Sequence, residues 1–288
     1  MSWSITGILD ATTDYFRKKG IDSPRINAEW LLVHILNYQD RIRLYLEFDK
    51  ILLESEIIQY RNLIQRRIRG EPLQYIIGHT QFFQVILKVN PDVLIPRPET
   101  EQLVEKAVER IKQDNKAKGC DILELGTGSG AISIALAHAL PHAEIWSVDR
   151  SISASQLARQ NAITNQVGHQ IRFWAGDRFE ALQSHSFDYI ISNPPYVTLE
   201  EWRELPSEIR DFEPSIALIA DQNGMSFYYY LIGQIDRFLK KQGWMMLEIG
   251  ETQLHELEAF IRSQPAALNP VFSRDYNHKD RFLFIQNP

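Results

Sequence analysis

The residues of this chain best suited to chemistry are four consecutive ones, Asn193-Pro194-Pro195-Tyr196, which follow the strand-like run 187–192. In open α/β sheets, ligands bind at the carboxyl ends of strands. Because each proline fixes its φ angle and lacks an N–H group, the segment offers carbonyl oxygens and one side-chain amide to whatever lies in front of it. Such acceptors suit a substrate that carries an NH2 group. We therefore expect an amino or amide group to bind here.

A second set of residues, upstream of this motif, predicts a nucleoside-containing cofactor. The apolar strand 122–125 runs directly into Gly126-Thr127-Gly128-Ser129-Gly130, and a helix is expected from Ala131. Glycines let the backbone turn tightly and approach a ligand closely. The next expected strand, 144–148, leads into Asp149, whose carboxylate can accept both hydroxyl groups of a ribose. The loop alone also fits a structural strand–helix turn, and with Asp149 it fits NAD as well as S-adenosylmethionine.

Asp177 and Arg178 form a third candidate contact, because they follow the expected strand 170–174. The Asp177 carboxylate is placed to accept a hydrogen bond from the amino group of an adenine. The alternative is that Asp177 caps the N-terminus of the next helix.

The elements that must position these residues fall into two patterns. Helical periodicity dominates residues 1 to about 75. We expect a first helix whose apolar positions run from 5 to 16 and which stops at Gly20, a second that opens at Ser23-Pro24 and has apolar positions up to 35, and a third over 53–69. A β-hairpin is expected over 79–95, followed by a helix from Pro98 to about 113. From residue 120 onward, strands and helices alternate, which predicts an α/β fold with a doubly wound, mostly parallel seven-stranded sheet. The expected strands are 121–125, 144–148, 170–174, 187–192, 243–249, 269–273 and 281–286. Helices are expected between most of these strands, near 129–139, 151–165, 224–241 and 251–263. The last two strands are expected to form an antiparallel hairpin.

Composition narrows the class of protein. The chain has 288 residues, a formal net charge of −6 and a single cysteine. The negative balance argues against affinity that depends on neutralising many phosphates, so no nucleic-acid substrate is expected, and the basic run 61–69 is interpreted as a solvated helix face. No apolar run approaches the ~20 residues that span a bilayer. No signal peptide is evident, so we expect a cytoplasmic protein without a membrane partner. No spacing of histidines or cysteines predicts a metal site.

Five motifs together resemble a known family, the protein glutamine N5-methyltransferases of the HemK/PrmC type, which modify peptide-chain release factors. Asn-Pro-Pro-Tyr at a strand end is typical of amino-group methyltransferases, which favours S-adenosylmethionine over NAD. The resemblance runs from about residue 25 to the C-terminus. The motifs are Gly70-Glu71-Pro72-Leu73-Gln74-Tyr75-Ile76-Ile77-Gly78, Leu94-Ile95-Pro96-Arg97-Pro98-Glu99-Thr100-Glu101, Leu123-Glu124-Leu125-Gly126-Thr127-Gly128-Ser129-Gly130, Ser192-Asn193-Pro194-Pro195-Tyr196 and Leu247-Glu248-Ile249-Gly250.

The resemblance implies a fold, a cofactor and a substrate. The fold would be a Rossmann-like class I methyltransferase domain over 98–288, preceded by a helical substrate-docking domain over 1–75 and a β-hairpin linker over 76–97. S-adenosylmethionine would contact residues 126–130, Asp149, Arg178 and Asn193. Asn193, Pro194, Pro195 and Tyr196 would hold the substrate amide, which in this family is the glutamine of a Gly-Gly-Gln loop in class I release factors. Asn193, Pro194 and Tyr196 would be the catalytic residues.

The sequence departs from the family pattern in two places. Glu124 stands where the family often has Asp, and the C-terminal turn reads Asp275-Tyr276-Asn277 with Arg281 later, where the family often has Asp-x-Gly followed by Arg. We expect Asn277 to adopt the left-handed conformation of that glycine, and neither departure to touch the site.

Three other functions fit the site residues. One is an adenine N6-methyltransferase acting on nucleic acid, which would need a basic groove and base flipping. The second is a ribosomal-protein glutamine methyltransferase, which would use the same catalytic residues. The third is a module that binds adenosine cofactors without chemistry. The roles of Arg97, Glu99, Phe82 and Phe83 stay open, because they suit substrate contacts as well as structural packing.

Overall fold

The computed structural model describes residues 3–182, 185–264 and 268–288. They form two compact units. The smaller unit comprises the chain up to His79 together with Pro206–Phe212, and the larger unit comprises Thr80–Leu205 and Glu213–Pro288.

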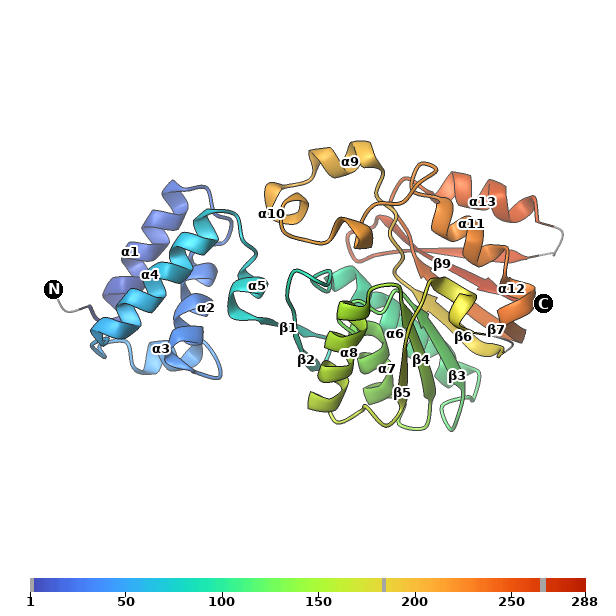
Figure 1. Cartoon of the computed structure of the whole chain (residues 1–288), viewed down its shortest axis with the longest axis horizontal. Helices are drawn as coiled ribbons and strands as arrows, with labels where there is room; N and C mark the ends of the chain where they lie inside the picture. Colours follow the sequence, from blue (N-terminus) through green and yellow to red (C-terminus); the bar gives the residue numbers. More distant parts are fainter. Residues whose placement is uncertain (1–2, 183–184, 265–267) are drawn as a thin grey trace. The chain divides into compact units, whose positions relative to one another are not determined.

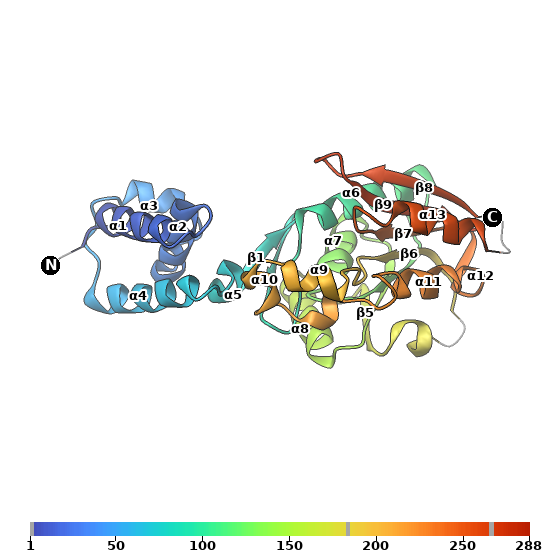
Figure 2. The same cartoon turned by 90° about the horizontal axis from the view of Figure 1, so that it is seen from above.

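The smaller unit is helical, and its described helices enclose one apolar core (Figure 1). α2 packs against both α1 and α4 (Figure 2). Tyr60 lies fully buried among them and donates a hydrogen bond of 2.9 Å to the Ala28 carbonyl oxygen. The helices are α1 (Ile5–Lys18), α2 (Pro24–Leu36), α3 (Ile42–Leu46), α4 (Glu54–Ile68), α5 (Leu73–Ile77) and, from the distant segment, α10 (Ser207–Arg210).

The three long helices confirm the prediction for this region, whereas α3 and α5 were not anticipated. Each has five residues, which is too short for helical periodicity to be detected. The interpretation of 61–69 as a solvated face is wrong for Arg67, which is 5% exposed. Its guanidinium donates to Asn27 Oδ1 at 2.7 Å and to Glu208 Oε2 at 2.8 Å. Arg67 thus anchors the distant segment that contains α10.

The larger unit is built on a seven-stranded sheet with the order β5-β4-β3-β6-β7-β9-β8 (Figure 1). The first five strands of that order pair in parallel, and β9 pairs antiparallel with both β7 and β8. This confirms the predicted doubly wound sheet and its antiparallel hairpin. The strands are β3 (Asp121–Leu125), β4 (Glu144–Asp149), β5 (Ile171–Ala175), β6 (Phe187–Ser192), β7 (Leu239–Glu248), β8 (Asn269–Arg274) and β9 (Asp280–Gln286).

Helices cover both faces of this sheet. On one face α6 (Pro98–Gln113), α7 (Ala131–Ala139), α8 (Ile152–Thr164) and the hairpin of β1 (His79–Phe82) and β2 (Val85–Lys88) share a core with alternate strand residues such as Ile122. On the other face α11 (Ser226–Ile232), α12 (Ile235–Phe238) and α13 (Leu254–Arg262) share a core with strand residues such as Leu123, Ile190 and Met245. Both faces being buried explains why the strands read as continuous apolar runs.

The chain order places a switch point between β3 and β6. Strand order runs outward from β3 through β4 and β5 on one side, and through β6 and β7 on the other. The crevice at such a point is where open α/β sheets bind ligands.

The region 197–241 differs most from expectation. It holds α9 (Leu199–Glu204), α10 and the 3-10 turn η2 (Ser215–Ala217), none of which was predicted, and the single helix expected over 224–241 is divided into α11 and α12. β7 begins at Leu239 because that residue pairs with Phe187, ahead of a register shift in the ladder. Gln242 has a φ of 61°, so the strand bulges where the sequence pattern indicated a helix end. None of the helices in the described ranges combines the length and apolarity that a bilayer-spanning segment requires.

Candidate functional site

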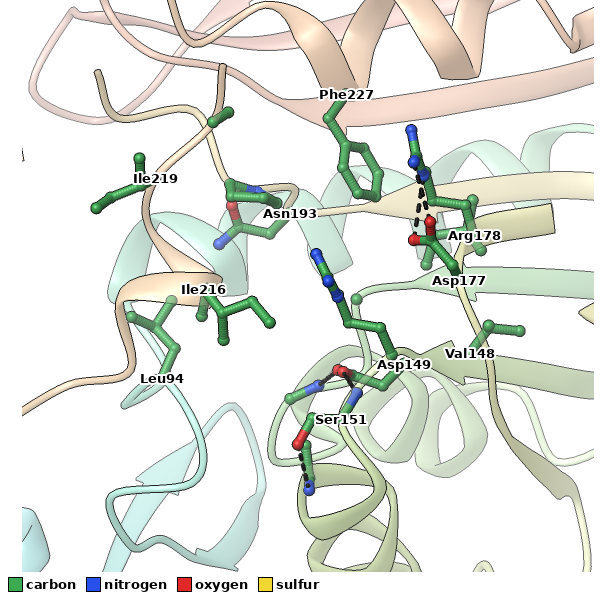
Figure 3. A pocket seen from close by; sticks show the side chains of 18 of the residues that line it. Leu94, Val148, Asp149, Ser151, Asp177, Arg178, Asn193, Ile216, Ile219 and Phe227 are labelled. Carbon is green, nitrogen blue, oxygen red and sulfur yellow. Dashed lines mark hydrogen bonds and ion pairs between the residues drawn. The ribbon is translucent and has the colours of Figure 1, made fainter. Parts of the chain in front are cut away.

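A cavity of about 270 Å³ opens at the carboxyl ends of the parallel strands, at the switch point. In Figure 3, Leu94, Ile216 and Ile219 gather on one side of it, and Asp177 and Arg178 stand on the other. The predicted site residues that line it are Gly126, Gly128, Asp149, Asp177, Arg178, Asn193 and Pro195. Thr127, Ser129, Gly130, Pro194 and Tyr196 lie outside the lining.

The loop after β3 contains three glycines, each with a positive φ between 52° and 83°. Two of them, Gly130 and Gly128, serve different purposes. A Cβ at Gly130 would lie 2.9 Å from Ile134 Cδ1 and 3.2 Å from Ala158 Cβ, so this glycine lets α7 and α8 approach. A Cβ at Gly128 would meet no atom within 4 Å. Gly128 therefore leaves room for a ligand at the cavity wall, whereas Gly130 permits packing behind it.

Thr127 and Ser129 support the loop from below. Both are buried, and Thr127 Oγ1 lies 2.7 Å from Ser147 Oγ, which in turn donates to Glu124 Oε2 at 2.6 Å. Burial raises the pKa of Glu124 to about 8, against the effect of the hydrogen bond from Ser147. The carboxyl group that departs from the family pattern is thus a buried anchor beneath the glycine loop.

Asn161 on α8 is a supporting residue that sequence reasoning missed. Its Nδ2 donates to the carbonyl oxygens of Ser129 at 2.9 Å and Lys88 at 3.0 Å, and its Oδ1 accepts from the Lys88 N–H at 2.8 Å. It therefore ties the glycine loop to β2. No pattern in the sequence marks an asparagine within a helix for this role, because its partners are 32 and 73 positions away.

Asp149 is held by backbone donors at the edge of the cavity. Its Oδ2 accepts from the Gly128 N–H and its Oδ1 from the Ser151 N–H, both at 2.8 Å (Figure 3). Burial raises the pKa of Asp149, while these two hydrogen bonds oppose the shift. A carboxylate oxygen can accept more than one hydrogen bond, so both oxygens retain acceptor capacity for the hydroxyl groups of a ribose.

Asp177 and Arg178 form a forked ion pair on the opposite wall. Arg178 donates to the two Asp177 oxygens at 3.2 and 3.0 Å, and its guanidinium lies 4.2 Å from the Tyr230 ring centroid. The hydrogen bond from Arg178 lowers the pKa of Asp177. Asp177 makes no capping hydrogen bond to the 3-10 turn η1 (Arg178–Ala181) that follows it. The Asp177 side chain therefore does not act as a cap. The position of Asp177 on the cavity wall fits a contact with an adenine.

Asn193 follows β6 at the rim of the cavity. Its Nδ2 donates to Thr100 Oγ1 at 3.0 Å, and Thr100 Oγ1 donates to Glu248 Oε2 at 2.7 Å. The amide NH2 is therefore engaged behind the cavity, which leaves Oδ1 as the acceptor available to a ligand. The neighbouring Ser192 hydroxyl donates to the Leu125 carbonyl oxygen at 2.6 Å and joins the two central strands.

Tyr196, the last residue of the motif, is not among the residues that line the cavity. Its hydroxyl donates to Glu248 Oε1 at 3.4 Å, and its ring packs against the core beneath α11 and α13. Burial, followed by the nearby Glu248 carboxylate, raises the pKa of Tyr196. Burial also raises the pKa of Glu248 to about 7, and the positive charge of Arg281 opposes that shift.

The C-terminal turn corrects two expectations. The residue with positive φ is His278, at 61°, and not Asn277, because Asp275 Oδ1 accepts from the N–H groups of Asn277 and Lys279 and so closes the turn around His278. Arg281 is also not remote from the site, since its charge acts on Tyr196 and Glu248.

Three of the four residues left open, Arg97, Phe82 and Phe83, take structural places. Arg97 Nη2 lies 2.5 Å from Glu213 Oε1, and the buried Glu213 also accepts from the Ile95 N–H at 3.1 Å. This ties the segment before α6 to the segment that carries Ile216. Phe82 is buried in the core beside α6, and Phe83 packs against the same core. Within the described ranges, no group of three or more His, Cys, Asp or Glu side chains is arranged to hold a metal ion.

Comparison with known proteins identifies the cofactor and the family. The chain matches the PrmC N-terminal domain over residues 8–78 and the methyltransferase small domain over residues 102–205. The release factor glutamine methyltransferase of Aliivibrio fischeri is 37% identical over 289 residues, which cover 99% of this chain and 98% of the relative. That of Geobacter sulfurreducens is 39% identical over 248 residues, which cover 86% of this chain and 84% of the relative.

Among solved structures, a methyltransferase from Pyrococcus furiosus shares the fold, with a TM-score of 0.53, 16% identity, and coverage of 81% of this chain and 99% of that one. Together these matches make the chain an S-adenosylmethionine-dependent methyltransferase. With two full-length or nearly full-length relatives of the same activity, the chain belongs to the release factor glutamine methyltransferase family.

Proposed function

We propose that this protein transfers a methyl group from S-adenosylmethionine to the side-chain amide nitrogen of the glutamine in the Gly-Gly-Gln loop of class I release factors. The observation that carries the proposal is the orientation of Asn193. Its NH2 group is bound to Thr100, which leaves Oδ1 as the hydrogen-bond acceptor of a side chain that lines the cavity at the switch point of the sheet.

The cavity walls suit the cofactor. Gly128 leaves space at the wall, the oxygens of Asp149 can accept from the ribose hydroxyls, and Asp177 can accept from the adenine amino group. When bound, S-adenosylmethionine supplies a methyl group on a positively charged sulfur, which is already strongly electrophilic. The residues of this chain are therefore needed for geometry more than for activation.

The substrate nitrogen needs help because an amide lone pair is delocalised into the carbonyl group. The Asn193 Oδ1 and the Pro194 carbonyl oxygen would each accept one N–H of the glutamine amide, and so direct the remaining lone pair toward the methyl carbon. The same two oxygens would stabilise the positive charge that grows on nitrogen in the transition state. The motif holds no titratable base, and a methylated, protonated amide is acidic enough to lose its proton to water. Tyr196 would support this arrangement through Glu248.

The helical unit would dock the release factor. From α3 to the residue before α4 it exposes a run of large apolar side chains, and exposed apolar patches mark interaction sites. The run comprises Ile42, Tyr45, Leu46, Phe48, Ile51 and Leu53, of which Leu46 is 75% exposed. Substitution of Leu46 by Glu should raise the KM for the release factor while leaving cofactor affinity unchanged.

A substrate that works in translation also supports a cytoplasmic location for the reaction. The net charge of −6 favours a protein over a nucleic-acid substrate.

The deciding experiment is methyl transfer from labelled S-adenosylmethionine to purified, unmodified release factor. Ribosomal protein, tRNA and DNA are assayed alongside. We expect mass spectrometry to find one added methyl group on the glutamine of the Gly-Gly-Gln loop, and none when that glutamine is replaced by asparagine. Transfer to one of the other substrates with none to the release factor would overturn the proposal.

A further inference from the structure

Three polar side chains from separate elements form a connected line behind Asn193. Thr100 lies in the first turn of α6, Glu248 ends β7, and Tyr196 is the last residue of the motif after β6. Asn193 Nδ2 donates to Thr100 Oγ1 at 3.0 Å, Thr100 Oγ1 donates to Glu248 Oε2 at 2.7 Å, and the Tyr196 hydroxyl reaches Glu248 Oε1 at 3.4 Å. Thr100 is 4% exposed and Glu248 is 1% exposed, so water does not compete for these bonds.

The line has a direction because a hydroxyl group has a single proton. The ionised form of Glu248 only accepts hydrogen bonds, so while Glu248 is ionised the Thr100 hydroxyl gives its proton to it. Thr100 Oγ1 can then only accept from Asn193, which must present its NH2 to Thr100. A terminal carboxamide is otherwise free to turn over, since its two ends have nearly the same shape.

The orientation of Asn193 decides what the site can bind. With NH2 held by Thr100, Oδ1 is the atom of this carboxamide that can accept an N–H from a substrate in the cavity. In the reverse orientation, an NH2 group would face the NH2 group of the substrate, and two donors cannot form a hydrogen bond.

We propose that Thr100 and Glu248 are positioning residues, which hold the Asn193 carboxamide in its accepting orientation and thereby set the site for a substrate that donates N–H. The proposal rests on the proposed function for the identity of the substrate. Neither residue needs to touch the substrate, because each acts through Asn193.

The charged and titratable groups around Glu248 come from β9, α6, α11 and the loop that follows β6. Arg281 on β9 favours the ionised form, Glu99 in the first turn of α6 disfavours it, Tyr196 donates to it, and the Tyr228 hydroxyl on α11 donates to the Glu248 backbone carbonyl oxygen. Arg281 is thus the cation that supports the ionised carboxylate on which the direction of the line depends.

The test compares Thr100→Val, which keeps the shape and removes the hydroxyl, with Thr100→Ser, which keeps the hydroxyl. We expect Thr100→Val to lower kcat about 10- to 100-fold, the usual effect of losing a group that orients a contacting residue. Cofactor Kd and the melting temperature should stay near those of the wild type, and Thr100→Ser should restore most of kcat. Thr13→Val is the matched control, because Thr13 is also buried and donates to the Leu9 carbonyl oxygen within the helical unit, whose described residues are not among those that line the cavity.

The outcomes separate this inference from the proposed function. If the wild type methylates release factor and Thr100→Val keeps its kcat, the positioning role is wrong. It is also wrong if Thr100→Val loses cofactor affinity in proportion to kcat, since Thr100 would then be structural. If the wild type does not methylate release factor, the proposed function fails. The inference is then decided by NMR of the Asn193 side-chain amide, whose hydrogen exchange should accelerate in Thr100→Val and not in Thr100→Ser.

Discussion

Replacing Asn193 by alanine is the most direct perturbation of the proposed chemistry. The change removes the Oδ1 acceptor at the rim of the cavity and also the NH2 that donates to Thr100 at 3.0 Å. A hydrogen bond that strengthens as charge develops in the transition state contributes about 3 to 4 kcal/mol, so we expect kcat to fall roughly 10²- to 10³-fold. Cofactor affinity should change much less, because the ribose and adenine contacts come from other strands.

The assay is single-turnover methyl transfer with saturating cofactor and release factor, together with calorimetric measurement of cofactor Kd. Asn193→Asp is a useful companion, because it retains an oxygen acceptor but loses the donation to Thr100 and places a negative charge one hydrogen-bonded residue away from the buried Glu248. We expect it to be impaired as well. Near-normal turnover by Asn193→Ala, with the protein folded, would refute the reasoning that geometry at this oxygen controls the reaction.

Three further predictions concern the cofactor side of the site. Asp149→Asn should raise the cofactor Kd, measured by isothermal titration, about 10- to 100-fold, because the loss of a charged hydrogen bond costs about 1.5–3 kcal/mol. The carboxylate accepts two backbone N–H groups with its two oxygens, whereas an amide has only one oxygen. An unchanged Kd would contradict the ribose contact. Gly130→Ala should destabilise the fold and weaken cofactor binding more than Gly20→Ala. Both glycines have a positive φ, but a Cβ at position 130 would lie 2.9 Å from a side-chain carbon, whereas a Cβ at position 20 would meet no atom within 4 Å. Equal melting temperatures for the two variants would contradict this prediction. Burial raises the pKa of Glu124 from 4.5 to about 8, so between these two pH values the native state holds a proton that the unfolded state has lost, and the free energy of unfolding should fall as the pH rises. Glu124→Gln should flatten this fall when unfolding is measured by denaturant titration at several pH values. The same dependence of unfolding free energy on pH in both proteins would disprove the assignment of Glu124 as a buried acid.

The parts of the fold that periodicity describes were predictable. Strands buried on both faces read as apolar runs, and the long helices carry clear apolar faces, so the seven-stranded sheet and the three long helices of the smaller unit followed from local patterns. The errors lie where tertiary pairing overrides local preference. Leu239 joins β7 because it pairs with Phe187, and the bulge at Gln242 has no periodic signature.

By itself, the sequence determined the chemistry-bearing positions at strand ends: the glycine loop, Asp149, and the Asn193 motif. These follow from short contiguous motifs, whose residue types and spacing are local information. Only the tertiary structure decided how those residues are supported. Thr100, Asn161 and Glu248 act through hydrogen bonds that span 32 to 148 positions along the chain, and such contacts exist only once the sheet has brought the ends of its strands together. Buried polar groups must find partners when water is excluded, and which partners they find is set by the fold and not by their neighbours in the sequence.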